Sequence, residues 1–120
     1  MSDRRRSEYV KRLSVAGWGN LESVQLLLNS IAGDVADALA RDEYDKADAE
    51  AAARFRGDVF ALWQATLHTD PMIDPRLLKE RLSALREKCV DPVARFAERL
   101  DRAVAKAEAL IQEYPRLEGR

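Results

Sequence analysis

Apolar residues recur at steps of three and four along most of the chain, which is the pattern of amphipathic α-helices. The strongest stretch runs from residue 21 to about residue 42, and its main face carries Leu21, Val24, Leu28, Ile31, Val35 and Leu39. A second row lies on nearly the opposite face and carries Leu26, Ser30, Gly33 and Asp37. Because glycine has no side chain, Gly33 would let another backbone approach closely. This helix is therefore predicted to be central, with neighbours on both sides.

A shorter helix is predicted before it, over residues 3–15. The sequence Gly17-Trp18-Gly19-Asn20 that follows favours a turn, because two glycines lie close together. Asn20 would then cap the central helix, and Trp18 would fold back onto Val24.

Residues 45–67 form the next predicted helix, with an apolar stripe made of Ala47, Ala51, Phe55, Val59, Leu62, Trp63 and Thr66. Gly57 lies in its middle and costs roughly 1 kcal/mol of helix propensity relative to alanine. We therefore expect either a close helix crossing or a bend at Gly57. Phe60 falls off the stripe, and together with Trp63 it predicts an exposed aromatic patch.

Two Asp-Pro pairs begin the last two predicted helices, residues 75–90 and 92–113. Aspartate is a strong helix cap, and proline is tolerated in the first helical turn. No loop separates these two helices, so they could equally form one long rod that is kinked at Pro92. Pro115 is predicted to end the last helix and to leave a short tail over residues 115–120.

These elements predict a single domain over residues 1–120, with an all-α fold and an antiparallel bundle of four to five helices. A chain of 120 residues fits one domain and can bury most of the surface that its unfolded form exposes. The predicted core contains Val24, Leu28, Ile31, Phe55, Leu62, Leu82, Phe96 and Leu100.

Composition favours a folded, soluble protein. The chain is 47% hydrophobic and 34% charged, which is typical of globular rather than disordered proteins. Its longest uninterrupted apolar run is Leu26-Leu27-Leu28, far too short to span a membrane, and no apolar segment follows the N-terminal arginines. One cysteine cannot form an internal disulfide. We therefore expect a cytoplasmic protein with no membrane partner.

The inventory of reactive residues argues against most enzyme classes. His68 and Cys89 are the only histidine and cysteine, so the common zinc sites are excluded. Asp42, Asp45 and Asp48 recur at steps of three and could hold magnesium, but acids at the start of a helix more simply oppose its dipole. No glycine-rich phosphate loop occurs. We expect no catalytic residue, no metal and no cofactor.

Charge is distributed unevenly along the chain. Residues 1–20 hold five basic and two acidic residues, whereas residues 34–50 hold two basic and seven acidic residues. A basic and an acidic surface could pair between two copies of the chain, or each could simply be solvated. With no catalytic set in the sequence, we predict a non-catalytic protein-interaction module: an adaptor, inhibitor or assembly subunit that binds a protein partner or forms a homo-oligomer. The predicted contact residues are Leu26, Asp37, Asp45, Asp48, Phe60 and Trp63.

A nucleic-acid-binding subunit of a larger nucleoprotein complex is the alternative. A basic row follows one flank of the last predicted helix and, together with two N-terminal arginines, could follow a phosphate backbone. The same row could equally meet the acidic segment of a second copy, or it could simply be solvated. The residues concerned are Arg5, Arg6, Arg95, Arg99, Arg102 and Lys106. The sequence PRLLKERL at residues 75–82 also resembles a late helix of the small helical subunits of type III CRISPR effector complexes. That resemblance implies an all-helical subunit that uses basic residues to bind a nucleic-acid strand.

Overall fold

The computed structural model describes residues 15–67 and 73–118, with side chains described for 19–67 and 73–112. Within these ranges the chain forms four α-helices and one short 3₁₀ helix: α2 (Val15–Ala40), α3 (Lys46–Leu67), α4 (Pro75–Glu87), η1 (Ala94–Phe96) and α5 (Ala97–Glu118). The prediction of an all-α fold is confirmed. None of the described helices combines the length and the apolar character that crossing a membrane would require.

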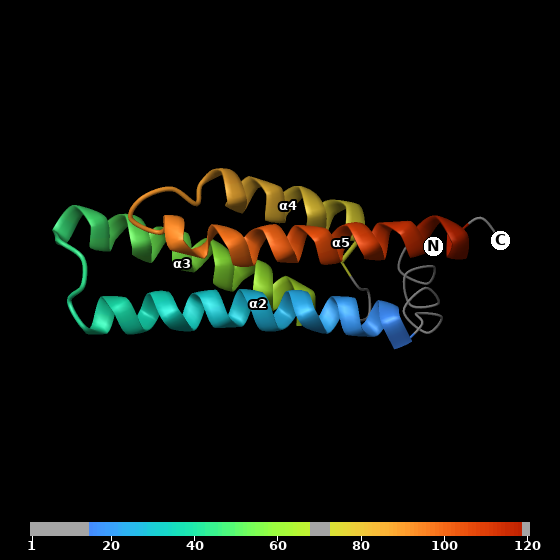
Figure 1. Cartoon of the computed structure of the whole chain (residues 1–120), viewed down its shortest axis with the longest axis horizontal. Helices are drawn as coiled ribbons and strands as arrows, with labels where there is room; N and C mark the ends of the chain where they lie inside the picture. The colour runs from blue at the N-terminus through green and yellow to red at the C-terminus, as the bar shows by residue number, and fades with distance from the viewer. Residues whose placement is uncertain (1–14, 68–72, 119–120) are drawn as a thin grey trace.

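The four α-helices lie side by side, and successive helices run in opposite directions (Figure 1). The molecule is elongated, with extents of 53 × 21 × 21 Å. The helix α2 packs extensively against α3 and α5, and α5 packs against α2 and α4. The helices α3 and α4 touch each other far less. The central position predicted for α2 is therefore shared with α5, and one side of the bundle is left comparatively open.

The core forms where the apolar stripes of the four helices meet. All eight residues predicted to form it are buried, each with at most 5% of its surface exposed. Removing apolar surface from water stabilises the fold by about 25 cal/mol per Å², so this cluster supplies most of the driving force for folding. Helical periodicity alone identifies these positions, because the apolar stripe marks the one face of each helix that can be buried.

The turn predicted at Gly17-Trp18-Gly19-Asn20 is wrong. The helix α2 begins at Val15 and continues without interruption to Ala40, so Asn20 lies inside a helix and does not cap one. Two glycines disfavour a helix by roughly 2 kcal/mol in total. Burial of Leu21 and Val24, the next positions of the apolar stripe, favours continuing the helix and offsets that penalty. The helix predicted over residues 3–15 falls outside the described residues except at Val15, and so do Arg5 and Arg6.

The kinked rod proposed for the last two helices is also wrong. The helix α4 ends at Glu87, the chain reverses over residues 88–93, and α5 begins at Ala97, so the two helices pack antiparallel against each other. The reversal brings the buried leucines of α4 and α5 into one core, which a continuous rod cannot do. Asp91 therefore caps no helix. The helix α5 also continues through Pro115 to Glu118, although proline removes one backbone hydrogen bond.

Asp74 caps α4 as predicted, because its Oδ1 accepts a hydrogen bond of 2.8 Å from the backbone N–H of Arg76. We expect Asp74→Ala to lower the free energy of unfolding by about 1 kcal/mol, since a first-turn N–H group loses its acceptor. Urea denaturation followed by circular dichroism measures this loss. Asp91→Ala is the matched control, because Asp91 is exposed and caps no helix. Equal losses in the two variants would contradict the assignment of the cap.

Candidate interaction surfaces

An aromatic surface, made of Phe60, Trp63 and Leu67, lies on the flank of α3 next to α2. The rings of Phe60 and Trp63 have centroids 5.3 Å apart and are tilted by 40°. Phe60 is 36% exposed and Leu67 is 48% exposed, whereas Trp63 is half-buried against the core. The guanidinium group of Arg56 lies 5.7 Å from the centroid of the Phe60 ring. The predicted exposed aromatic patch is therefore present.

Two hydrogen bonds between α2 and α3 hold this flank in place. Arg56 Nε donates to the backbone carbonyl of Ala32 at 3.0 Å, and Gln25 Nε2 donates to the carbonyl of Thr66 at 2.9 Å. They lie on either side of Phe60 along α3. The aromatic surface is therefore displayed from a fixed pair of helices and not from a loop.

The outer face of α2 is open to solvent. Leu26 is 61% exposed, and Gly33 and Asp37 are exposed as well. A Cβ atom built at Gly33 or at Gly57 would meet nothing within 4 Å. The predicted close approach of another backbone at Gly33 is therefore not found within the described chain. Of the two expectations at Gly57, the close crossing does not occur, and the bend stays a prediction. Gln25 contacts α3 through its hydrogen bond to Thr66. Leu26 is the next residue of α2, so the helical turn places it outside that contact, facing solvent.

The acidic residues at the turn between α2 and α3 have a structural role. Asp45 Oδ1 accepts a hydrogen bond of 2.9 Å from the backbone N–H of Asp48, which caps the first turn of α3. Asp48 itself is exposed in that turn, where a negative charge opposes the positive end of the helix dipole. Among the side chains described for residues 19–67 and 73–112, no group of three or more His, Cys, Asp or Glu is placed to hold a metal ion.

The first two residues of the basic row, Arg95 in η1 and Arg99 in α5, are engaged by acids of the same chain. Arg99 Nη1 lies 2.6 Å from Asp34 Oδ2 and donates to Ser30 Oγ at 2.8 Å, so it ties α5 to α2. Arg95 lies 3.8 Å from Glu43 in the turn that follows α2. Both guanidinium groups also lie against the ring of Phe96, at 4.9 and 5.6 Å from its centroid. Part of the acidic segment of residues 34–50 therefore pairs with the basic row of the same chain. Pairing of that segment with residues 1–20 stays a prediction, because residues 1–14 lie outside the described part of the chain.

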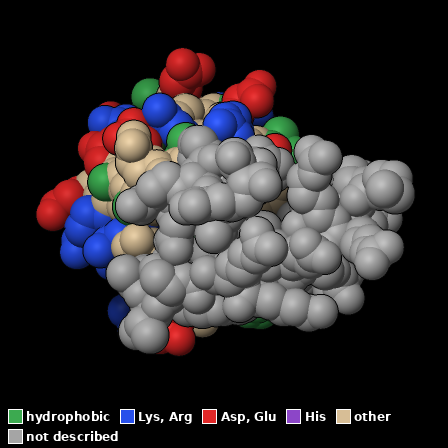
Figure 2. All heavy atoms as spheres, turned by 90° about the vertical axis from the view of Figure 1, so that its right-hand side faces the viewer, with side chains coloured by type: hydrophobic (Ala, Val, Ile, Leu, Met, Phe, Trp, Pro, Cys, Tyr) green, Lys and Arg blue, Asp and Glu red, His purple; other side chains and the backbone are tan. Residues whose placement is uncertain are grey.

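The rest of the basic row is more exposed. Arg102 lies 3.6 Å from Glu98 one turn earlier in α5, and both side chains are largely solvated. Lys106 is exposed further along the same flank. Among the described side chains visible in Figure 2, basic and acidic groups are interspersed.

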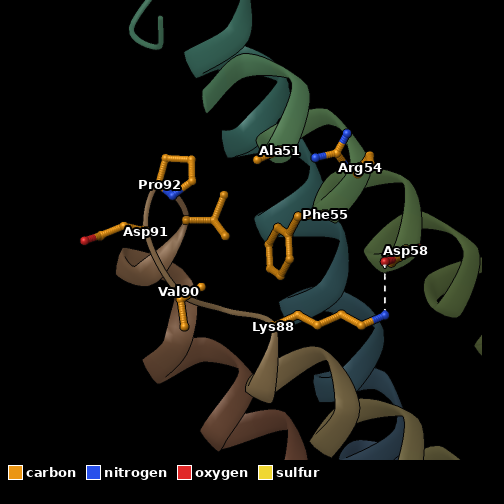
Figure 3. Close-up of a pocket in the computed structure, with 9 residues that line it drawn as sticks. Ala51, Arg54, Phe55, Asp58, Lys88, Val90, Asp91 and Pro92 are labelled. Atoms are coloured by element: carbon orange, nitrogen blue, oxygen red, sulfur yellow. Dashed lines mark ion pairs between the residues drawn. The ribbon is translucent and has the colours of Figure 1, made fainter. Parts of the chain in front are cut away.

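Two cavities lie along the flank of α3 that faces α4 and the loop after it, and no local pattern of the sequence indicates them. One has a volume of about 350 Å³ and lies where α3 faces the loop between α4 and α5, with Phe55 and Pro92 on opposite walls (Figure 3). The other has a volume of about 220 Å³ and lies further along the two helices, beside Leu62 and Leu85. Both are consequences of the sparse contact between α3 and α4. We refer to the two together as the α3–α4 groove.

Cys89, the only cysteine, is not placed for nucleophilic chemistry. Its side chain is buried, and its Sγ donates a hydrogen bond of 3.2 Å to the backbone carbonyl of Val93. Burial raises the pKa of the Cys89 thiol, and the charge of the nearby Arg86 opposes this only in part. A raised pKa keeps the thiol protonated at neutral pH, and the protonated form is a poor nucleophile.

Comparison with protein-family models, with curated proteins and with solved structures found no match to this chain. The likeness of residues 75–82 to a helix of CRISPR effector subunits therefore gains no support from these comparisons.

Proposed function

We propose that the chain is a non-catalytic protein-interaction module, an adaptor, inhibitor or assembly subunit that binds a protein partner or a second copy of itself. The observation that carries this proposal is the aromatic surface of Phe60, Trp63 and Leu67, which α2 leaves partly uncovered. Aromatic side chains are enriched in the buried centres of protein interfaces, and neighbouring exposed apolar groups mark interaction sites. A single, buried cysteine suits a reducing compartment, and we place the protein in the cytoplasm.

Nucleic-acid binding through the basic row is the weaker candidate. Binding to phosphates requires cations that are free to replace the counterions of the strand. Arg95, Arg99 and Arg102 already lie beside carboxylates, which a phosphate would have to displace. We therefore expect the purified protein to elute from gel filtration without a raised 260/280 nm absorbance ratio. A raised ratio that falls steeply with added salt would reverse this preference.

A photo-crosslinking residue placed at Gln64 tests the proposed surface. Gln64 is exposed, and it lies between Phe60 and Leu67 on α3. We expect a cross-linked product of defined mass, whose yield falls about tenfold in Phe60→Glu because a buried contact would then carry an unpaired charge. In the same cross-linking assay, a lower yield in Leu26→Glu would show that the outer face of α2 also contributes to the contact. A product of twice the mass of the chain identifies a second copy, and light scattering checks that assignment.

The matched control for this experiment is Leu77→Glu on α4, because Leu77 is 38% exposed and Phe60 is 36% exposed. The same yield in wild type and Leu77→Glu, with a loss in Phe60→Glu, supports the aromatic surface. No specific product, or a product that Phe60→Glu leaves unchanged in a folded protein, would remove this surface as the site of interaction.

A further inference from the structure

The side of the bundle between α3 and α4 is closed by a single long ion pair among the described residues. Lys88 Nζ lies 3.8 Å from Asp58 Oδ2, and both side chains are largely exposed. The contact between α2 and α5 is closed by a 2.6 Å ion pair. The contact between α4 and α5 has two ion pairs of 2.8 and 2.9 Å, namely Arg86–Asp101 and Lys79–Glu108. The Lys88–Asp58 pair is exposed and long, so it contributes little and opens easily.

The two cavities of the α3–α4 groove follow one line along α3. Asp58 and Lys88 line both of them, so the ion pair lies at their junction. Phe55 lines the first cavity and Leu62 lines the second, and each residue is 5% exposed. These residues are two helical turns apart on α3, which corresponds to about 10 Å. Two apolar side chains separated by two turns of another helix match this distance.

The groove is edged by unpaired positive charge. Arg54 borders the first cavity and Arg81 borders the second, and no carboxylate of the described part of the chain forms an ion pair with either. Asp91 contributes to the wall of the first cavity, but its carboxylate points away from Phe55 (Figure 3). A ligand that follows the groove would therefore meet apolar walls, the exposed Asp58–Lys88 ion pair at the junction of the two cavities, and two guanidinium groups that no described carboxylate pairs. The ligand that complements this arrangement carries an apolar stripe flanked by carboxylates.

We infer that the α3–α4 groove binds an acidic amphipathic helix of a partner protein. Apolar side chains at positions i and i+7 of that helix enter the two cavities, and its glutamates or aspartates pair with Arg54 and Arg81. An amphipathic helix held in an apolar groove through such spaced anchors is a recurrent mode of peptide recognition. Ala61 and Ala84 line the second cavity and are exposed, so their small side chains leave room for a helix.

This site is distinct from the aromatic surface. Arg56 and Trp63 mark the flank of α3 that faces α2, whereas Asp58 and Ala61 mark the flank that faces α4. A partner in the groove and a partner on the aromatic surface therefore bind to opposite flanks of α3. Substitutions on one flank leave the other intact, which allows the two proposals to fail separately.

The probe for the groove is a synthetic helical peptide of about 20 residues, roughly 30 Å long, with leucines along one stripe and glutamates beside them. A second peptide carries lysine at every glutamate position. Binding of the labelled peptides to the full chain is measured by fluorescence anisotropy. We expect saturable binding of the glutamate peptide, at least about tenfold tighter than binding of the lysine peptide.

Two variants of the groove test whether the glutamate peptide binds there. Ala84→Trp fills the second cavity from an exposed position, and the double variant Arg54→Glu with Arg81→Glu reverses the charge at the edges. We expect either change to weaken binding of the glutamate peptide by at least about tenfold, and the charge reversal to make the lysine peptide the preferred ligand. Ala105→Trp, at an exposed alanine on α5, is the control and should leave binding unchanged. Circular dichroism confirms that each variant is folded.

Other outcomes would overturn the inference. These are no binding of either peptide, equal binding of both, or binding that neither groove variant weakens. Binding that is lost in Phe60→Glu and kept in Ala84→Trp would place the peptide on the aromatic surface, which ends the groove proposal and supports the other. A dimer that Ala84→Trp dissociates in light scattering would make a second copy the occupant in place of an acidic helix.

Discussion

Replacing Phe96 with alanine is expected to lower the free energy of unfolding by about 3–5 kcal/mol. Phe96 lies in η1, directly before α5, and only 2% of its surface is exposed. Its ring stacks on Phe55 of α3, with centroids 6.4 Å apart and planes 18° apart. Arg95 and Arg99 cover the ring from the solvent side. The substitution therefore leaves a cavity and also removes the aromatic face against which both guanidinium groups rest.

Phe60→Ala is the control for that loss, because it removes the same side chain from a site that is 36% exposed. We expect it to lower the free energy of unfolding by about 1 kcal/mol, since less apolar surface returns to water and no enclosed cavity forms. Urea denaturation followed by circular dichroism compares the two variants at equal protein concentration. A loss in Phe60→Ala as large as that in Phe96→Ala would contradict the described burial of the two rings.

The parts of the fold that could be predicted are those that local physics decides. The stripe containing Val24, Leu28 and Ile31 identifies the face of α2 that is buried, because only one face of a helix can meet the core. The Asp74-Pro75 pair identifies the start of α4, because a carboxylate cap and a proline in the first turn act within a few residues. Neither inference requires knowledge of any distant part of the chain.

The predictions that failed depended on tertiary packing. Gly17-Trp18-Gly19-Asn20 has the residues of a turn, but burial of the following stripe keeps it within α2. Asp91-Pro92 has the same local signature as Asp74-Pro75 and yet lies in the reversal between α4 and α5. Local sequence cannot separate these two pairs, because the difference lies in which helix the following residues pack against.

The candidate sites also divide into features that local sequence predicts and features that depend on tertiary packing. Exposure of Phe60 followed from its position beside the stripe of α3, so the aromatic surface could be predicted. Attraction between acidic and basic segments could also be predicted, but composition does not state whether Arg99 meets Asp34 of its own chain or of another copy. The α3–α4 groove could not be predicted, because it depends on how far apart two helices settle after both have packed on their neighbours.

Replacing both Gly33 and Gly57 with alanine is expected to raise the free energy of unfolding by about 1–2 kcal/mol. Each glycine lies inside an exposed helical segment, and alanine is favoured there by roughly 0.5–1 kcal/mol. No glycine of the described chain has a positive φ, and an added Cβ at either site would meet nothing within 4 Å. Urea denaturation measures the gain. Ala61→Gly, the reverse change at an exposed position of α3, should lower stability by a similar amount per site.

A lower or unchanged free energy of unfolding in the double variant would contradict the open surroundings of these glycines. The single variant Gly57→Ala also bears on the proposed function. Gly57 lies on the exposed side of α3, between the flank that carries Phe60 and the flank that carries Asp58. If partner helices contact only those two flanks, Gly57→Ala raises stability and leaves both cross-linking at Gln64 and peptide binding unchanged. A raised stability with weakened binding would instead place the partner's backbone against Gly57, because only then does an added methyl group obstruct it.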